Sequence, residues 1–144
     1  MKTQIIIRFL LFVFVAISFT NCSKSDAINP NNLADTMVGS YAITQVITGG
    51  RTITLPVMQG NDQQSGVITV SKISTTNISI LFVVTTISNG KTDRQTSSGE
   101  VEVKQNGNSI DLYEDATFTS KVGNFTGGTL ILDVGSSKIT AKKN

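Results

Sequence analysis

The chain has 144 residues, with 12 Lys and Arg against 10 Asp and Glu, one cysteine and no histidine. Without histidine, neither a Ser-His-Asp nor a Cys-His catalytic arrangement can form within this chain, and the commonest transition-metal ligand is missing. A single cysteine excludes an internal disulfide, so the fold has to be held together by a packed core.

The first 21 residues have the layout of a secretory signal. Lys2 and Arg8 both precede an apolar stretch over residues 9–19. Secretory signals carry about 7–15 apolar residues behind a basic start, whereas a transmembrane helix needs roughly 20. We therefore expect residues 1–21 to be removed as a signal peptide. The remaining chain has 10 basic and 10 acidic residues, and this neutral balance argues against nucleic-acid binding.

The predicted signal ends immediately before Cys22, in the sequence Phe19-Thr20-Asn21-Cys22. This sequence resembles the lipobox of bacterial lipoproteins, with Phe19 and Asn21 at positions where that family usually has a leucine-like and a small residue. The resemblance implies that Cys22 carries acyl chains such as palmitate and becomes the new N-terminus. It also implies a protein held by lipid at the outer membrane of the cell envelope, facing the periplasm or the cell surface. Two or more acyl chains hold a protein firmly on a membrane.

Behind Cys22, the composition changes to Ser, Asn and Asp with one proline, which predicts a flexible tether over residues 22–34. Residues 35–144 have the size of one domain, and apolar and polar residues alternate along most of them. We expect one helical turn over residues 32–38. The expected strands cover residues 40–48, 52–57, 66–73, 77–88, 99–105, 109–114, 116–122, 128–134 and 137–142.

Tight turns are expected between these strands. The dipeptides that predict them are Gly49-Gly50, Asn89-Gly90, Asn106-Gly107, Gly123-Asn124 and Gly135-Ser136. Pro56 cannot donate to a ladder and is expected at a strand end or an edge. Residues 59–65 are expected to form the longest polar loop of the domain. Residues 77–88 carry apolar side chains on both faces, which predicts a central strand.

Short strands joined by tight turns form a meander, and a meander closes most naturally into an up-and-down β-barrel. The predicted fold is therefore all-β, a small up-and-down meander barrel of about eight or nine strands. A β-sandwich is the alternative. Its longer cross-sheet connections would use residues 59–65 and 92–98.

A short motif, Val38-Gly39-Ser40-Tyr41, opens the first expected strand. At the start of an anchored all-β domain of this size, it is similar to the lipocalin-like bacterial lipoproteins, which have Gly-x-Trp there, with Tyr41 in place of the tryptophan. The resemblance implies a lipocalin-like barrel in which Gly39 and Tyr41 have structural roles. Since an eight-stranded barrel has room for one small ligand, a small apolar ligand in the interior is the leading expectation.

Glu100 and Glu102 lie two residues apart on an expected strand, so both side chains project from one face about 7 Å apart. Glycosidases use carboxyl pairs at comparable separations. Val101 and Val103 alternate with the two glutamates, which is the pattern of an ordinary half-buried strand with a solvated face. We interpret the pair as that solvated face.

Asp111, Glu114 and Asp115 form a second acidic group, but the sequence lacks the loop that binds calcium in EF-hands. We interpret these residues as solvated acids at a hairpin end. The sequence therefore predicts no catalytic, cofactor-binding or metal site, and no enzyme. The expected protein is a monomeric, lipid-anchored binder of a small apolar ligand, with a surface-presented module for protein or glycan interaction as the alternative.

Overall fold

The computed structural model describes residue 28 and residues 30–144. The predicted signal peptide and Cys22 lie outside the described residues. Within them the chain forms one short helix and ten strands. Their bounds are α2 (Leu33–Met37), β1 (Gly39–Thr48), β2 (Arg51–Thr54), β3 (Val57–Gln59), β4 (Asp62–Lys72), β5 (Asn77–Ser88), β6 (Lys91–Asn106), β7 (Ser109–Tyr113), β8 (Lys121–Thr126), β9 (Thr129–Val134) and β10 (Ser137–Lys143).

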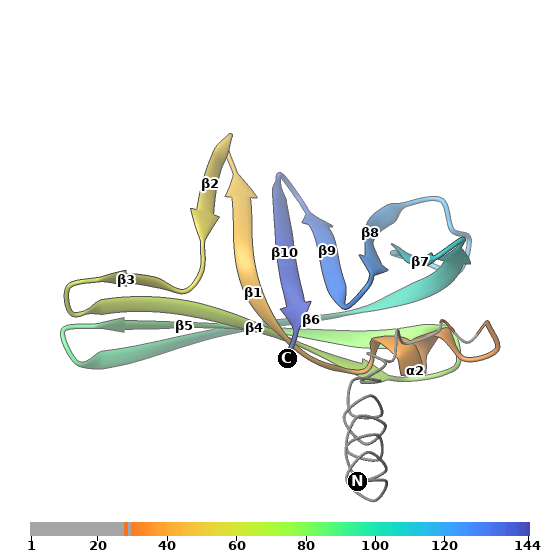
Figure 1. Ribbon diagram of the computed structural model, residues 1–144, viewed down its shortest axis with the longest axis horizontal. Coiled ribbons are helices and arrows are strands. Elements are labelled where there is room, and N and C mark those ends of the chain that lie inside the picture. The colour runs from red at the N-terminus through yellow and green to blue at the C-terminus, as the bar shows by residue number, and fades with distance from the viewer. Residues whose placement is uncertain (1–27, 29) are drawn as a thin grey trace, which may run out of the picture.

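The strands form a single antiparallel sheet in the order β2-β1-β10-β9-β8-β7-β6-β5-β4-β3. An additional pairing of β1 with β4 closes eight of them into an up-and-down barrel and leaves β2 and β3 outside the ring. The predicted meander barrel is thus confirmed over the β-sandwich. Figure 1 shows β1, β10 and β9 standing steeply across the long strands β4, β5 and β6.

Strand β1 changes its second partner halfway along. Residues 39–42 pair with β4, whereas residues 45–48 pair with β2. A β-bulge at Thr44 marks the change, and the Thr44 carbonyl oxygen accepts the N–H of Leu55 at 2.9 Å. The Thr44 hydroxyl donates to the carbonyl oxygen of Thr140 at 3.2 Å. Because a bulge bends its strand and increases the local twist, the second half of β1 diverges from β4.

Inward-facing side chains from all eight barrel strands fill the interior. The largest fully buried side chains are Tyr41, Met37, Ile68, Ile78, Ile110, Leu112, Leu130, Val70 and Val103. Tyr41 and Phe125 pack edge to face with ring centroids 6.1 Å apart, a geometry that adds about 0.5–1.5 kcal/mol to the burial of the two rings. Side chains can fill a barrel of eight strands, and the apolar cluster here includes residues from every strand of the ring and from α2.

Helix α2 packs against one end of the barrel with three buried residues, Leu33, Ala34 and Met37. The Ala34 N–H donates to the Thr75 carbonyl oxygen at 3.1 Å, which ties the helix to the turn between β4 and β5. The helix therefore belongs to the folded core. Leu33 and Ala34 come from the last two positions of the predicted tether, so packing begins before residue 35.

Two segments that the sequence predicts as connections are strands instead. Residues 59–65 and 92–98 belong to the antiparallel ladders of β3, β4, β5 and β6, and only a turn at residues 60–61 interrupts the first segment. In the described part of the chain, no second layer covers this end of the sheet, so polar side chains are tolerated there. The strand conformation comes from backbone pairing with β5 and, at Gln59 and Asp62, from pairing of β3 with β4, which the side chains themselves do not reveal.

The strand expected over residues 116–122 is also wrong in its first part. Residues 114–120 form a loop, and β8 begins at Lys121. In this loop the Asp115 carboxylate accepts both the backbone N–H and the hydroxyl of Thr117. A side chain thereby takes the place of a ladder partner, which is how aspartate competes with regular structure.

The dipeptide Gly123-Asn124, expected to be a turn, lies inside β8. A Cβ on Gly123 would stand 2.3 Å from the carbonyl oxygen of Ile131 on β9, so this glycine permits a close approach of two backbones. Pro56 lies between β2 and β3, at a strand end as expected. The other turns are confirmed at Gly49-Gly50, Asn89-Gly90, Gly135-Ser136 and, one residue later than predicted, Gly107-Asn108.

Candidate functional site

Strands β3 to β6 continue beyond the point where β1 leaves β4 and form an arm that projects from the barrel. We call this arm the blade and define it as residues 57–59, 62–66, 82–88 and 91–98. The β5–β6 ladder supports it and reaches from Asn77 opposite Glu102 to Ser88 opposite Lys91. In Figure 1 the blade extends to the left, away from α2. The root of the blade still packs against the core through Val57 and Phe82, whereas residues 91–98 of β6 are exposed throughout.

The outer face of the sheet is apolar at the root of the blade. Val67 of β4 lies opposite Val83 of β5 and beside Ala42 of β1, and Leu81 is the next outward residue of β5. Paired residues point to the same side of a sheet, and since the neighbouring Ile68 faces the core, these four residues face outward. Val67 is 37% exposed and Leu81 is 39% exposed. We call Ala42, Val67, Leu81 and Val83 the outer patch.

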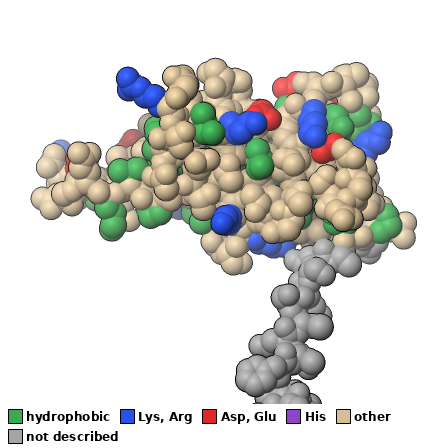
Figure 2. All heavy atoms as spheres, turned by 45° about the horizontal axis from the view of Figure 1, so that its top comes forward, with side chains coloured by type: hydrophobic (Ala, Val, Ile, Leu, Met, Phe, Trp, Pro, Cys, Tyr) green, Lys and Arg blue, Asp and Glu red, His purple; other side chains and the backbone are tan. Residues whose placement is uncertain are grey.

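The same face carries a further apolar residue at the tip of the blade. Met58 of β3 is 74% exposed and shares a row with Gln63 and Ile87. Figure 2 shows hydrophobic side chains at the surface along the projecting arm. Single exposed apolar residues are ordinary, but several gathered on one projecting sheet are typical of a contact surface.

Strand β5 is central in the sheet, as predicted, because β4 and β6 pair along its two edges. Its second apolar face, however, lies outside the barrel with no covering layer among the described residues. Sequence reasoning therefore missed the outer patch as a surface. The neighbouring strand could have indicated it. Thr96 and Ser98 of β6 lie opposite Val83 and Leu81, and polar residues there show that this face is not covered by a second apolar layer within the described part of the chain.

The inner face of the blade becomes polar toward its tip. One row across that face consists of Val57, Gln64, Thr86 and Asp93, and the Ser88 hydroxyl donates to Asp62 Oδ1 at 2.7 Å. Val57 packs against the core, so the apolar lining continues along β3 while β4, β5 and β6 become polar.

One edge of β6 lacks a partner strand in the described part of the chain. Residues 102–106 pair with β7, whereas residues 91–101 pair with β5 alone. Residues 91–100 are all exposed, and the Arg94 backbone N–H donates to the side chain of its own neighbour, Asp93, at 2.9 Å. A long unpaired edge is a template for another strand.

The two glutamates of the sequence analysis lie on the outer face of β6. Glu100 is exposed, and Glu102 Oε1 accepts a hydrogen bond from Asn77 Nδ2 at 2.8 Å. Between and beyond them, Val101 packs against the core and Val103 is buried in it. The predicted alternation is confirmed, and the chemical environment of the pair is that of a solvated strand face.

Asp111 is the buried charged residue of the described chain, with an exposed fraction of 5%. Its carboxylate forms an ion pair with Lys121 at 2.7 Å and accepts a hydrogen bond from Asn106 at 2.8 Å. Burial alone raises the pKa of Asp111, but the contacts with Lys121 and Asn106 outweigh burial, so the net effect lowers the pKa. Asp111 is thus an ionised, paired group with a structural role, and the interpretation of this residue as a solvated acid is wrong because β7 places it among Lys121 and Asn106.

The remaining acids of that group lie in the loop after β7. Glu114 and Asp115 are exposed, and hydrogen bonds from Thr117 lower the pKa of Asp115. The carboxylates of Asp115 and Asp111 are therefore bonded to residues close to them in the structure, Thr117 for the first and Lys121 and Asn106 for the second. Across residue 28 and residues 30–144, no three His, Cys, Asp or Glu side chains gather in a way that could hold a metal ion.

Gly39 and Tyr41 lie where the helix joins the barrel. Gly39 has a φ of 147°, a conformation that costs any residue with a side chain, and only Val38 separates it from α2. Tyr41 is fully buried, and its hydroxyl donates to the Met37 carbonyl oxygen at 2.5 Å. Their roles in this structure are architectural.

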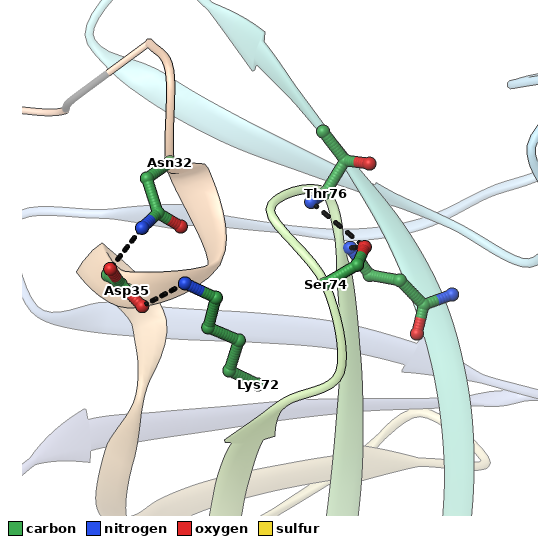
Figure 3. A network of polar contacts seen from close by, with 6 residues as sticks. Asn32, Asp35, Lys72, Ser74 and Thr76 are labelled. Atoms are coloured by element: carbon green, nitrogen blue, oxygen red, sulfur yellow. Dashed lines mark hydrogen bonds and ion pairs between the residues drawn. The ribbon is translucent and has the colours of Figure 1, made fainter.

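Polar contacts hold the outside of the same helix (Figure 3). Asn32 donates to one carboxylate oxygen of Asp35, and the other forms an ion pair with Lys72 of β4 at 2.9 Å. On the adjacent turn, Ser74 Oγ accepts the N–H of Thr76 at 3.3 Å. Exposed ion pairs contribute at most about 1 kcal/mol, so these contacts orient the helix more than they stabilise it.

No family model, curated protein or solved structure matches this chain. In the described residues, no helix combines the length and the apolar character needed to cross a membrane.

Proposed function

We propose that this protein is a non-enzymatic, lipid-anchored protein of the cell envelope whose β-domain is an interaction module. The observation that carries the proposal is the outer patch, an apolar surface on the outside of the barrel at the root of the blade, where Val67 and Leu81 are exposed. Large side chains such as Ile68, Ile110 and Leu130 are buried in the interior. Val67 and Leu81 of the outer patch, in contrast, are exposed on the outside of the barrel and can contact another molecule. A partner protein with an apolar surface of its own fits a flat patch of this kind.

The lipid anchor rests on the resemblance of the sequence around Cys22 to a lipobox. An anchor upstream of α2 suits the shape of the domain, because α2 and the tip of the blade lie at opposite ends (Figure 1). The blade is then directed away from the anchored end and can meet a partner.

Photo-crosslinking in cells tests the interaction module. A photoreactive amino acid at Leu81, on the outer patch, should form a discrete adduct with a second polypeptide. The matched control is the same amino acid at Ile131, an outward-facing aliphatic residue of β9 away from the patch. Val83→Lys should remove the Leu81 adduct without changing the thermal unfolding of the domain. Equal labelling from both positions would contradict the proposal.

The anchor is tested separately. Cys22→Ser should abolish incorporation of a labelled fatty acid and release the protein from the membrane fraction, whereas Ser23→Ala should do neither. Acyl labelling that survives Cys22→Ser would refute the assignment of Cys22.

A small apolar ligand at the open end of the barrel is a second candidate. It is favoured by an inner-face row in which Ile53 of β2 lies opposite Val46 of β1, and Val46 opposite Ile139 of β10. Ile53 is 39% exposed there. Solvent extraction and mass spectrometry of the purified protein should then yield one apolar compound at about one molecule per chain, and Ile53→Glu should abolish its recovery.

A further inference from the structure

We propose that the free edge of β6 pairs with the same edge of a second copy of this chain. The result is a two-fold dimer in which residues 93–101 of the two strands run antiparallel about Ser97. This departs from the monomer that the sequence predicts. The surface is separate from the outer patch, and the inference does not depend on the lipid anchor or on the partner proposed above.

The backbone supplies the first argument. In an antiparallel ladder, successive residues direct their N–H and C=O groups alternately to the two sides of the strand. The N–H of Arg94 is bonded to the Asp93 side chain and hence is not engaged with β5. Even-numbered residues of β6 therefore face the free edge, as they do further along, where residues 102–106 pair with β7. Among the described residues, no strand pairs with residues 94, 96, 98 and 100 on this side, and residue 94 offers its carbonyl oxygen while its N–H is held by Asp93.

This alternation restricts the register of a symmetric pair. Even-numbered residues of one copy must lie opposite even-numbered residues of the other, or the facing groups would already be bonded to β5. When Ser97 lies opposite its own counterpart, residue 94 faces residue 100 and residue 96 faces residue 98. Residues 94, 96, 98 and 100, whose backbone groups face the free edge, are then all paired with the second copy.

Charge selects among the permitted registers. Centring on Ser97 places Arg94 of each copy opposite Glu100 of the other, so two ion pairs form on the outer face. Centring on Thr96 would put Arg94 opposite Ser98 and form none. Centring on Ser98 would put Arg94 opposite Glu102, whose backbone is already paired with Tyr113 of β7.

The side chains of Arg94 and Glu100 are open to such partners. Both are exposed, and neither takes part in an ion pair among the described residues. Opposite charges that face each other across two strands stabilise the pairing, and like charges there oppose it. Asp93 weakens the pairing of this edge. In the single chain its side chain accepts the Arg94 N–H and so competes with the second copy for that donor.

Charge reversal tests the register with the full chain in detergent, by light scattering after size exclusion and by sedimentation. The wild-type chain should be a dimer. Arg94→Glu and Glu100→Arg should each weaken dimerisation by about tenfold or more, since like charges then face each other twice. The double variant Arg94→Glu/Glu100→Arg should restore it. Arg51→Glu, an exposed reversal on β2, is the matched control and should leave it unchanged, while Asp93→Ala should tighten it.

Cysteine substitution locates the axis in the membrane fraction. In the proposed register the two Ser97 Cα atoms are about 4.5 Å apart, within the range that a disulfide spans. Ser97→Cys should therefore give a covalent dimer under mild oxidation. Thr92→Cys should not, because its two copies are about 34 Å apart along the strands. The unsubstituted chain reports any background from Cys22.

The outcomes separate clearly. A chain that stays monomeric at about 100 µM, a double variant that fails to restore the dimer, or a Ser97→Cys adduct that proves to be a different polypeptide would each overturn the inference. Loss of the Leu81 adduct with an intact dimer, in contrast, would count only against the interaction module. Circular dichroism of each variant should match the wild type, because all substituted residues are exposed.

Discussion

The hydroxyl of Tyr41 donates a hydrogen bond of 2.5 Å to the carbonyl oxygen of Met37, which is the last residue of α2. A helix leaves its final carbonyl groups without partners inside the helix, and this one lies in the buried core. The tyrosine ring packs at the same time on Phe125 of β8. One side chain therefore closes the helix end and joins it to the far wall of the barrel.

Tyr41→Phe should lower the free energy of unfolding by about 1–2 kcal/mol, because it keeps the ring contact but removes the donor for a buried carbonyl. Tyr41→Ala should lower it by about 3–5 kcal/mol through the lost aromatic packing. Urea denaturation of the full chain measures both. Equal losses for the two variants would show that the hydroxyl, and not the ring, carries the effect, contrary to expectation.

Gly66→Ala should destabilise the barrel by about 1–3 kcal/mol. A Cβ at Gly66 would stand 2.7 Å from Cδ1 of Ile43, where β1 begins to diverge from β4. Ile43→Val removes that methyl group, so the double variant should lose less than the sum of the single changes. Gly99→Ala is the control, because no atom lies within 4 Å of a Cβ there. Thermal and urea unfolding of the wild type, the two single variants and the double variant measure this coupling.

Asp111→Asn should cost about 1–3 kcal/mol at pH 7, since Lys121 and Asn106 lose a charged partner. The pKa of Asp111 is lowered in the folded chain. Its contribution is therefore complete above the unfolded value, near 3.9, and is lost as pH falls through the folded pKa. In urea titrations, the difference between wild type and variant should shrink progressively as the pH falls below about 4.

The control for that titration is Asp133→Asn. Asp133 forms an ion pair of 3.6 Å with Lys138 in which both side chains are about half exposed. Surface pairs of this kind contribute at most about 1 kcal/mol, so the variant should unfold almost like the wild type at every pH. A pH dependence as large as that of Asp111→Asn would contradict the assignment to Asp111.

Asn89→Val should destabilise the β5–β6 hairpin by about 1–2 kcal/mol, because Asn89 has a φ of 51° and β-branched residues avoid that region. Asn89→Gly should be neutral or slightly stabilising. Hydrogen exchange at Ser88 and Lys91, which close the turn, measures the effect locally. Similar exchange rates in both variants would mean that the turn does not control the tip of the blade.

Much of the secondary structure follows from local patterns. Strand β5 has the predicted bounds, and Asn89-Gly90 forms the predicted turn, because alternation and turn chemistry act within a few residues. Val103 is buried and Glu100 exposed for the same reason. These features could be predicted because neighbours in the chain are sufficient to decide them.

Other elements depend on distant residues. Residues 63–65 and 92–98 are in strands because β5 pairs with them, and Gln59 is in a strand because it pairs with Asp62, although the composition of both polar segments is that of loops. Gly123 lies within a strand because the backbone of Ile131 comes close to it. Residues near Gly123 in the sequence could not show whether this glycine forms a turn or allows a neighbouring strand to approach closely.

The sequence by itself determined an all-β meander, most of its tight turns, the alternation of Val101 and Val103 with Glu100 and Glu102, and the resemblance at Cys22, all of which are local in the chain. Only the tertiary structure decided which faces remain uncovered. The pairing of β1 with β4 closes the barrel at residues 39–42 and leaves β3 to β6 projecting beyond it. That closure, a contact between strands far apart in the sequence, exposes the outer patch and the free edge on which the proposed functions rest.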